Sequence, residues 1–293
     1  MHKAGFVNIV GNPNVGKSTL MNQLVGEKLS IATFKAQTTR HRIMGIVNTE
    51  DTQIVFSDTP GVLKPNYKMQ EMMLQFSESA LADADILLYV TDVVEDPEKN
   101  MDFLEKVSKM SIPVILLINK IDESDQKTLG NLVTKWHGLL PNAEILPISA
   151  KNKFGVDILL KRVHELLPES PAFFDKDQLT DKPAKFFVSE IIREKILRYY
   201  DKEIPYSVEV VIERFKEDDR QIHINAVIYV ERSSQKGIII GHQGMALKKV
   251  STEARKSLER FFDKKIFLET FVKVDKDWRN SQKELKHFGY SPE

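Results

Sequence analysis

The sequence predicts an α/β domain, built on a mostly parallel sheet with helices on both faces, followed by a smaller α+β domain. Short apolar runs alternate with helix-periodic segments through the first 167 residues, which is typical of a parallel sheet. From residue 185 the order changes to one helix, two strands, two helices and one strand. Residues 168–184 hold three prolines and four acidic residues, so we expect them to be an interdomain linker.

Six strands are expected in the first domain, residues 1–167, because six apolar runs are each too short to be helices. They are residues 6–10, 43–48, 53–57, 86–90, 114–118 and 144–148. Apolar side chains recur at helical spacing between these runs, which predicts helices at residues 17–26, 69–82, 98–110, 127–140 and 156–167. The helical periodicity ends at Leu167, where the proline-rich stretch begins.

The second domain, residues 185–293 including a C-terminal tail, opens with a helix-periodic segment at 187–200. Two alternating runs, 206–215 and 221–231, flank the charged turn KEDDR and predict a hairpin. A short helix at 233–240, the tetrapeptide GHQG at Gly241–Gly244, a long helix at 245–262 and a strand at 265–274 complete the expected order.

The string GNPNVGKS fits the phosphate-binding pattern G-x-x-x-x-G-K-[ST] and directly follows a predicted buried strand. Its glycines allow backbone N–H groups to approach phosphate oxygens, and the helix that follows directs its positive end at the same anion. Lys17 is expected to neutralise the β and γ phosphates, and the Ser18 hydroxyl to bind Mg2+. The expected nucleotide contacts in this loop are Gly11, Asn12, Pro13, Asn14, Val15, Gly16, Lys17, Ser18 and Thr19.

A second string, NKID, places Asn119, Lys120 and Asp122 at the carboxyl end of a buried strand, the sheet edge where ligands bind in open α/β folds. The Asp122 carboxylate can accept hydrogen bonds from the ring N–H and the exocyclic amine of guanine. Adenine offers no such pair of donors and leaves the buried acceptor unpaired, which is costly. The sequence therefore predicts a site for GTP or GDP.

Three further segments fit the same site. In DTPG, Asp58 is placed to hold Mg2+, the Gly61 N–H to sense a γ phosphate, and Thr59 and Pro60 to line the nucleotide. One of two threonines, Thr38 or Thr39, is expected to close on Mg2+, and we favour Thr39. Ser149, Ala150 and Lys151 follow the run AEILPI and are expected to brace the guanine ring. The predicted catalytic residues are Lys17, Asn14, Thr39, Asp58 and Gly61, and the predicted metal ligands are Ser18, Thr39 and Asp58.

Composition narrows the class of protein. The chain has no cysteine, which excludes disulfides and thiolate chemistry. Its amino terminus lacks the apolar stretch of a signal peptide, and its longest apolar runs are far shorter than a membrane span. We therefore expect a soluble, cytoplasmic protein. Net charge is zero, but residues 232–265 carry nine basic side chains against three acidic ones, and this concentration favours a nucleic-acid partner.

The GHQG tetrapeptide joins two predicted helices, and basic residues follow it. Its glycines would let a nucleic-acid backbone lie against the loop, with N–H groups near a helix start facing the phosphates. Unpaired bases would occupy an adjacent apolar groove, so binding should favour single strands. The expected RNA contacts are Lys236, Gly241, His242, Gln243, Gly244, Lys248 and Lys249.

The strings GNPNVGKST, KAQTTRHR, DTPG, NKID, SAK and GHQGMALKKV occur in the order typical of one family. On these residues the chain resembles the Era family of bacterial GTPases over essentially its whole length. The resemblance implies a P-loop GTPase domain followed by a type II KH domain. It also implies a monomer that assists assembly of the small (30S) ribosomal subunit by binding 16S rRNA near its 3′ end, and that associates peripherally with the inner face of the cell membrane.

One departure concerns hydrolysis. Ras-like GTPases place a water-orienting glutamine directly after the DxxG element, whereas this chain has Val62, which cannot orient water. Asn14 resembles the asparagine that K+-stimulated GTPases use to hold a monovalent cation beside the phosphates. We therefore expect K+ to supply part of the charge stabilisation, alongside Mg2+.

We expect GTP to order residues 32–42 and the segment after Gly61, and so to control RNA binding. Two alternatives stay open at the level of sequence. The C-terminal domain could dock a protein or membrane partner rather than RNA, or the site could use ATP.

Overall fold

The computed structural model describes residues 2–33, 35 and 37–290. Two members of the segment expected to close on the nucleotide, Phe34 and Ala36, lie outside this set. The described residues form two compact units, one from residues 2–66 and 70–181, the other from residues 67–69 and 182–290. Within these ranges no helix combines the length and apolarity needed to span a bilayer.

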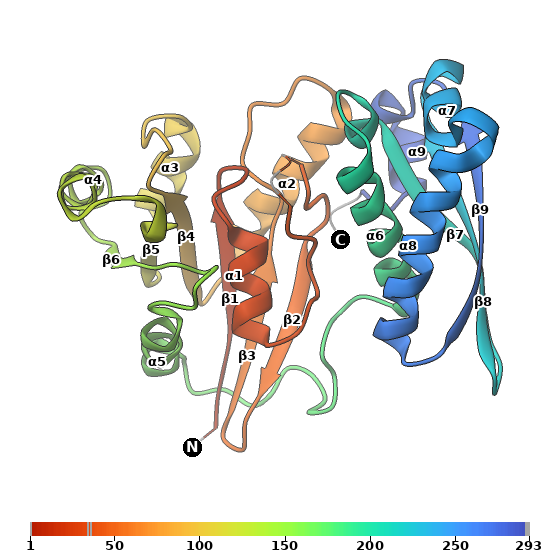
Figure 1. Ribbon diagram of the computed structural model, residues 1–293. Helices are drawn as coiled ribbons and strands as arrows, with labels where there is room; N and C mark the ends of the chain where they lie inside the picture. Colours follow the sequence, from red (N-terminus) through yellow and green to blue (C-terminus); the bar gives the residue numbers. More distant parts are fainter. Residues whose placement is uncertain (1, 34, 36, 291–293) are drawn as a thin grey trace. The chain divides into compact units, whose positions relative to one another are not determined.

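The first unit is a six-stranded sheet of order β2-β3-β1-β4-β5-β6 (Figure 1). Its strands are β1 (Lys3–Gly11), β2 (Ile43–Asn48), β3 (Thr52–Asp58), β4 (Ile86–Asp92), β5 (Val114–Asn119) and β6 (Glu144–Pro147). All adjacent pairs are parallel except β2 and β3, which form an antiparallel hairpin. The predicted parallel sheet is thus observed with one antiparallel edge strand.

Four helices connect the strands and a fifth follows β6: α1 (Lys17–Val25), α2 (Lys68–Ala82), α3 (Met101–Ser108), α4 (Gln126–Leu139) and α5 (Val156–Leu166). Side chains of α2, α3 and α4 share one core cluster with β1, β4 and β5, including Val10, Leu87 and Trp136. Leu20 and Leu24 of α1 are buried as well. The third helix begins three residues later than predicted, because residues 97–100 form a turn in which the Asp96 carboxylate accepts from the Glu98 N–H.

Most of the expected interdomain linker is anchored to the first unit. The Ile46 N–H of β2 donates to Leu179 O at 2.8 Å, and Thr180 Oγ1 donates to Met44 O at 2.7 Å. Nearer its start, the linker is held by Gln53, whose Oε1 accepts from the Phe173 N–H at 2.7 Å. Residues 168–181 therefore run as an ordered strap, first beside residues 2–4 and then along the β2–β3 hairpin, instead of as a free tether.

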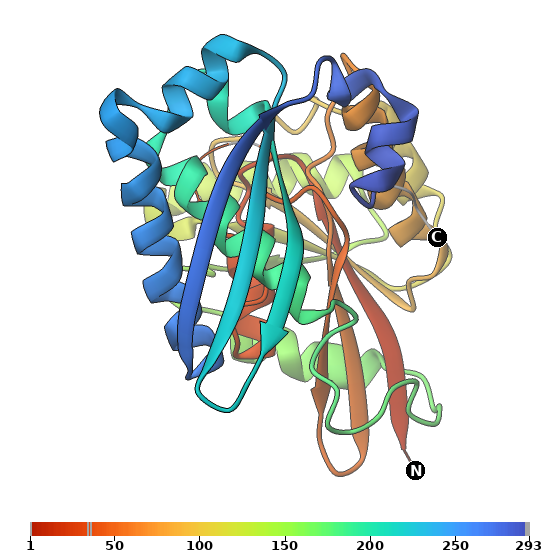
Figure 2. The same cartoon turned by 90° about the vertical axis from the view of Figure 1, so that its right-hand side faces the viewer.

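The second unit has the predicted order αββααβ: α6 (Ala184–Tyr199), β7 (Val208–Glu217), β8 (Gln221–Val230), α7 (Ser233–Ile240), α8 (Met245–Phe262) and β9 (Lys265–Val274). Strand β8 lies between an antiparallel partner, β7, and a parallel partner, β9. Alternate side chains of the sheet pack with α6, α7 and α8 in one core. Figure 2 shows the three strands in front of α6 and α8.

The predicted C-terminal tail contains structure of its own, a short helix α9 (Gln282–His287) preceded by a single 3-10 turn at Trp278–Asn280. Trp278 is fully buried, and its indole N–H donates to Ser207 O. A few scattered aromatic residues anchor this segment, and they carry no helical periodicity for sequence analysis to detect.

Candidate functional sites

The phosphate loop runs from the end of β1 to the start of α1, as the motif predicts. Gly16 caps the helix with a left-handed backbone, φ +96°. The Lys17 side chain is buried, and its ammonium donates to Gly11 O at 3.0 Å and to Asn12 O at 2.8 Å. Loop carbonyls therefore hold the lysine at the place where the motif puts phosphate oxygens.

Burial lowers the pKa of Lys17 to about 8, against the opposing attraction of the Asp58 and Glu95 carboxylates. A bound diphosphate would stabilise the ammonium and raise this pKa. We therefore expect proton uptake on GDP binding, and an affinity that falls toward tenfold per pH unit as pH rises above 8. Calorimetry in two buffers of different ionisation enthalpy, at pH 7–9 in EDTA, measures this uptake. An affinity that stays constant over this range would contradict the expectation.

The three predicted metal ligands meet at one point. Ser18 Oγ donates to Asp58 Oδ2 at 2.8 Å and lies 2.8 Å from Thr39 Oγ1, which itself donates to the same carboxylate oxygen at 3.2 Å. Thr38 instead donates to Lys35 O and contacts Thr33. The structure therefore brings Thr39, the favoured candidate, to the cluster.

Two properties of Asp58 suit a divalent cation. Its side chain is fully buried, and burial raises the pKa of Asp58, opposed by the Lys17 charge and by hydroxyl donors. Its second oxygen, Oδ1, has no hydrogen-bond partner among the described residues. Two hydroxyls and a carboxylate with one buried, unpaired oxygen form a donor set that fits Mg2+.

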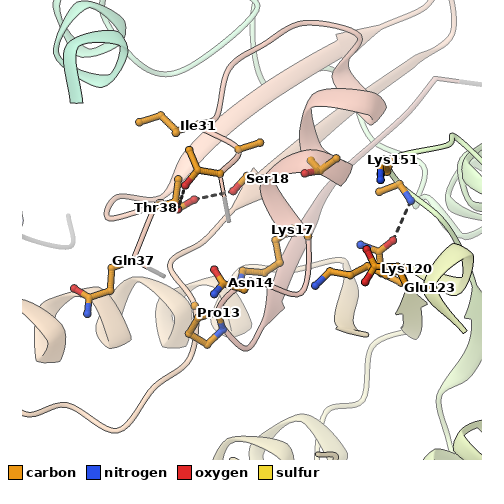
Figure 3. A pocket seen from close by; sticks show the side chains of 18 of the residues that line it. Pro13, Asn14, Lys17, Ser18, Ile31, Gln37, Thr38, Lys120, Glu123 and Lys151 are labelled. Carbon is orange, nitrogen blue, oxygen red and sulfur yellow. Dashed lines mark hydrogen bonds between the residues drawn. The ribbon is translucent and has the colours of Figure 1, made fainter. Parts of the chain in front are cut away.

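The guanine-side residues are connected to the phosphate loop through Asn119. Its buried amide donates to Val15 O at 2.8 Å, and its Oδ1 accepts from the Ala150 N–H at 2.9 Å. Ser149 Oγ donates to Asp122 Oδ1 at 2.6 Å, which fixes the carboxylate expected to read the base. One cavity joins these elements and is lined from Pro13 and Lys17 to Lys120, Asp122 and Lys151 (Figure 3).

The DTPG segment divides into a part that faces the nucleotide site and a part that faces the core. Gly61 lines the cavity, and a Cβ there would meet Pro13 atoms at 2.7 Å. Thr59 Oγ1 donates inward to Ile9 O, and Pro60 O accepts from Ser77 Oγ. Val62 is buried in the core. Thr59 and Pro60, predicted to line the nucleotide, therefore serve to position Gly61.

Several residues of the site carried no recognisable sequence signal. Asn100 Nδ2 donates to Asn12 Oδ1 and to Val62 O, so it ties the phosphate loop to the segment after Gly61. Asp92 accepts from Lys120 Nζ at 2.5 Å. Ile31 lines the cavity as well, next to Ala32 and Gln37 of the segment 32–42 that the sequence predicted to respond to the nucleotide. Asp92 is the last residue of β4, and Asn100 directly precedes α3. Neither position belongs to a recognised motif, so only the spatial neighbours of these residues reveal their role.

The second predicted site is the GHQG loop between α7 and α8. Gly241 has φ +70°, and a Cβ there would meet Ala246 Cβ at 2.6 Å, so a side chain is not tolerated without movement. His242, Gln243, Lys248 and Lys249 are exposed, and Lys236 is half-buried. Two exposed apolar side chains, Ile238 and Met245, flank the loop. A glycine loop with basic and apolar neighbours is suited to unpaired nucleotides.

Comparison with known proteins gives consistent matches. Residues 6–120 match the family described as 50S ribosome-binding GTPase, and residues 203–279 match the KH domain family. The chain is 44% identical to the GTPase Era of Clostridium kluyveri, covering 99% of this chain and 100% of that protein. It is 46% identical to the GTPase Era of Geobacter sp. (strain M21), with 98% of each chain covered.

Two solved structures match over nearly the full chain at 37% identity. One is Era in complex with MgGDPNP and nucleotides 1506–1542 of 16S ribosomal RNA, with a TM-score of 0.95 and 100% of both chains covered. The other is a point variant of Aquifex aeolicus Era bound to GDP·AlF4−, with a TM-score of 0.94, 99% of this chain and 100% of that chain.

Proposed function

The chain belongs to the Era family of GTPases, and from this premise we propose that it binds 16S rRNA near its 3′ end under the control of GTP and acts in assembly of the 30S subunit. The observation that carries the proposal is the full-length match to an Era structure that holds a nucleotide analogue and an rRNA fragment together. The two sites described above supply the matching chemistry.

We propose that hydrolysis depends on Mg2+ held by Ser18, Thr39 and Asp58, whose cluster supports this assignment. When bound, the ion would neutralise charge on the β and γ phosphates. Lys17 adds a second positive charge once phosphate oxygens replace the loop carbonyls. The Gly61 N–H donates to the γ phosphate when GTP is bound. Asn119 holds the phosphate loop and the loop at Ser149–Lys151 together.

K+ is the proposed second cation. Val62 is buried, its N–H donates to Gly11 O and its carbonyl accepts from Asn100, so this position does not orient water. Asn14 is exposed at the cavity with a left-handed backbone, φ +67°. We expect single-turnover GTP hydrolysis to be at least tenfold faster in KCl than in NaCl, and Asn14→Ala to abolish the difference. Equal rates in the two salts would refute the K+ proposal.

The strap offers a route for nucleotide control. Residues 32–42 lead directly into β2, whose Met44 and Ile46 are hydrogen-bonded to residues 179–180. The chain enters α6 only four residues after Thr180. A nucleotide-dependent rearrangement of residues 32–42 would therefore be transmitted through β2 to residues 179–180, and from there to the start of the second unit. By linkage, RNA must alter GTP affinity by the same factor as GTP alters RNA affinity.

The test is fluorescence anisotropy with an RNA of the sequence of nucleotides 1506–1542, with GDP and with GDPNP. We expect salt-dependent binding that differs between the two nucleotides and weakens at least tenfold in the variant His242→Asp/Gln243→Asp. An RNA affinity that is the same in the loop variant as in wild type, and the same with GDP as with GDPNP, would refute the proposal. Capture of a protein or a lipid vesicle by the same loop, without RNA, would support the docking alternative.

Localisation and assembly state follow as further proposals. We propose a cytoplasmic monomer that meets the 30S subunit there and contacts the inner face of the cell membrane peripherally. The basic stretch of residues 232–265 supports attraction to both anionic surfaces.

A further inference from the structure

The sheet of the second unit has one face that its helices do not cover. Successive side chains of a strand point to opposite faces, and one set packs with α6, α7 and α8. We call the other set the outer face, and Figure 2 shows it toward the viewer. Strand register arranges the outer face in four rows across β7, β8 and β9: Lys216–His223–Phe267, Arg214–Asn225–Glu269, Val211–Val227–Phe271 and Glu209–Tyr229–Lys273.

The described part of the C-terminal segment contacts the last of these rows. Tyr290 Oη donates to Glu209 Oε2 at 2.5 Å, and the Phe288 ring lies 5.3 Å from the Tyr229 ring. The other three rows carry exposed aromatic side chains at β9, where Phe267 and Phe271 are 49% and 48% exposed, whereas Val227 at the centre of its row is fully buried. The core lies on the opposite face of the sheet, so folding does not require phenylalanine at these two positions. Two half-exposed phenylalanines on one face therefore indicate a binding surface.

These three rows separate aromatic from basic side chains. Phe267 and Phe271 lie on β9, with the His223 ring 5.5 Å from Phe267. Arg214 and Lys216 lie on β7, exposed and without an ion pair among the described contacts. Two strand spacings place the basic column about 10 Å from the aromatic column, a separation comparable to that between a nucleotide's base and its phosphate.

Most acidic groups on and around this face are engaged. Glu213 pairs with Lys273 at 2.8 Å, Glu217 with Lys264 at 2.9 Å, and Asp218 lies 3.5 Å from His223. Glu269, between the two phenylalanines, is an acceptor suited to the exocyclic amine of a base. The charge left unpaired on β7 is therefore positive, which favours an anionic partner.

We propose that the outer face is a second contact surface for single-stranded RNA, with bases stacked on Phe267 and Phe271 and phosphates held by Arg214 and Lys216. This inference rests on the RNA binding proposed above and extends it. The GHQG loop joins α7 and α8, the helices on the opposite side of the sheet. An RNA must therefore be longer than the few nucleotides of the loop groove to contact both surfaces.

The experiment compares two RNAs on the full chain: the 37-nucleotide RNA of sequence 1506–1542 and a six-nucleotide RNA from its 3′ end. The variant Phe267→Leu/Phe271→Leu keeps apolar bulk but removes the aromatic faces. Base stacking on an aromatic ring contributes about 1–3 kcal/mol per base, so we expect at least tenfold weaker binding of the long RNA and unchanged binding of the short one. Phe173→Leu, which replaces a phenylalanine that is 46% exposed in the first unit, is the control and should change neither.

A second variant tests the basic column. Arg214→Gln/Lys216→Gln should reduce the slope of log affinity against log salt for the long RNA by about 1.4, since each phosphate contact on a single strand contributes about 0.7. Ultraviolet crosslinking should place the long RNA on residues 265–273. Both results would support the outer face as an RNA surface.

Other outcomes overturn the inference in distinguishable ways. If the leucine variant binds the long RNA like wild type, the outer face is not an RNA surface, although the loop variant can still establish the proposed function. If it weakens both RNAs equally, the phenylalanines support the fold only. If wild type binds neither RNA, the proposed function fails as well.

Discussion

Replacing Asp122 by asparagine should lower GTP affinity by a factor of 100 to 1,000 and raise the affinity for xanthosine triphosphate. The wild-type carboxylate is held by Ser149 Oγ at 2.6 Å, so the asparagine amide should take the same position. It then directs a donor at the guanine N–H groups, and an unmatched polar contact of this kind costs about 3–4 kcal/mol when two hydrogen bonds are lost. Xanthine has an oxygen where guanine has its amine and can accept from the new amide.

Displacement of a fluorescent GDP by GTP, xanthosine triphosphate and ATP measures this change. Asp219→Asn is the matched control, because it makes the same change of charge in the exposed turn between β7 and β8, and it should leave all three affinities unchanged. An Asp122→Asn protein that keeps wild-type preference for GTP would show that another group reads the base. Equal affinities of the wild-type protein for ATP and GTP would remove the guanine site altogether.

The features of this protein that depend on neighbouring residues in the chain can be predicted from its sequence. The six strands and five helices of the first unit follow from apolar runs and periodicity, and the phosphate loop, Asp58, Asn119 and Asp122 follow from motifs whose residue types the chemistry requires. From sequence, Thr38 and Thr39 were both candidates for the metal ligand and Thr39 was only favoured. In the structure, Thr39 is the threonine that lies beside Ser18 and Asp58. The nucleotide site was therefore largely predictable.

What sequence misses depends on contacts between distant residues. Asn100 reaches the phosphate loop across 88 positions, and Gln53 reaches the linker across 120. Neither residue type nor spacing distinguishes them from other loop and strand amides. The proline-rich composition of the linker predicts its irregular backbone correctly, but the ladder of bonds to β2 depends on the exposed edge of that strand. The outer face of the second sheet is likewise visible only once the register is known.

Gly16→Ala should weaken GDP binding by roughly 100-fold, about 2.7 kcal/mol, even though it adds a single methyl group. A Cβ at this position would lie 2.2 Å from Asn119 Nδ2, at a backbone φ of +96° that side chains rarely adopt. The strained backbone costs about 1–3 kcal/mol. Displacement of Asn119 also breaks its bonds to Val15 O and the Ala150 N–H. The phosphate loop and the loop at Ser149–Lys151, which is expected to contact guanine, are then no longer held together by this side chain.

A mutant cycle separates these causes. In Asn119→Ala the amide is already absent, so adding Gly16→Ala should cost much less there than in wild type, and the difference measures the steric term. Gly130→Ala is the control, because this glycine lies within α4 and a Cβ there would meet no atom within 4 Å, so alanine should stabilise the fold by about 0.5–1 kcal/mol. Titration with fluorescent GDP and thermal unfolding give the two readouts. If the GDP affinity of Gly16→Ala is within threefold of wild type, Asn119 does not connect the phosphate loop to the loop at Ser149–Lys151. Ser149 and Asp122 must then maintain the guanine side of the cavity without it.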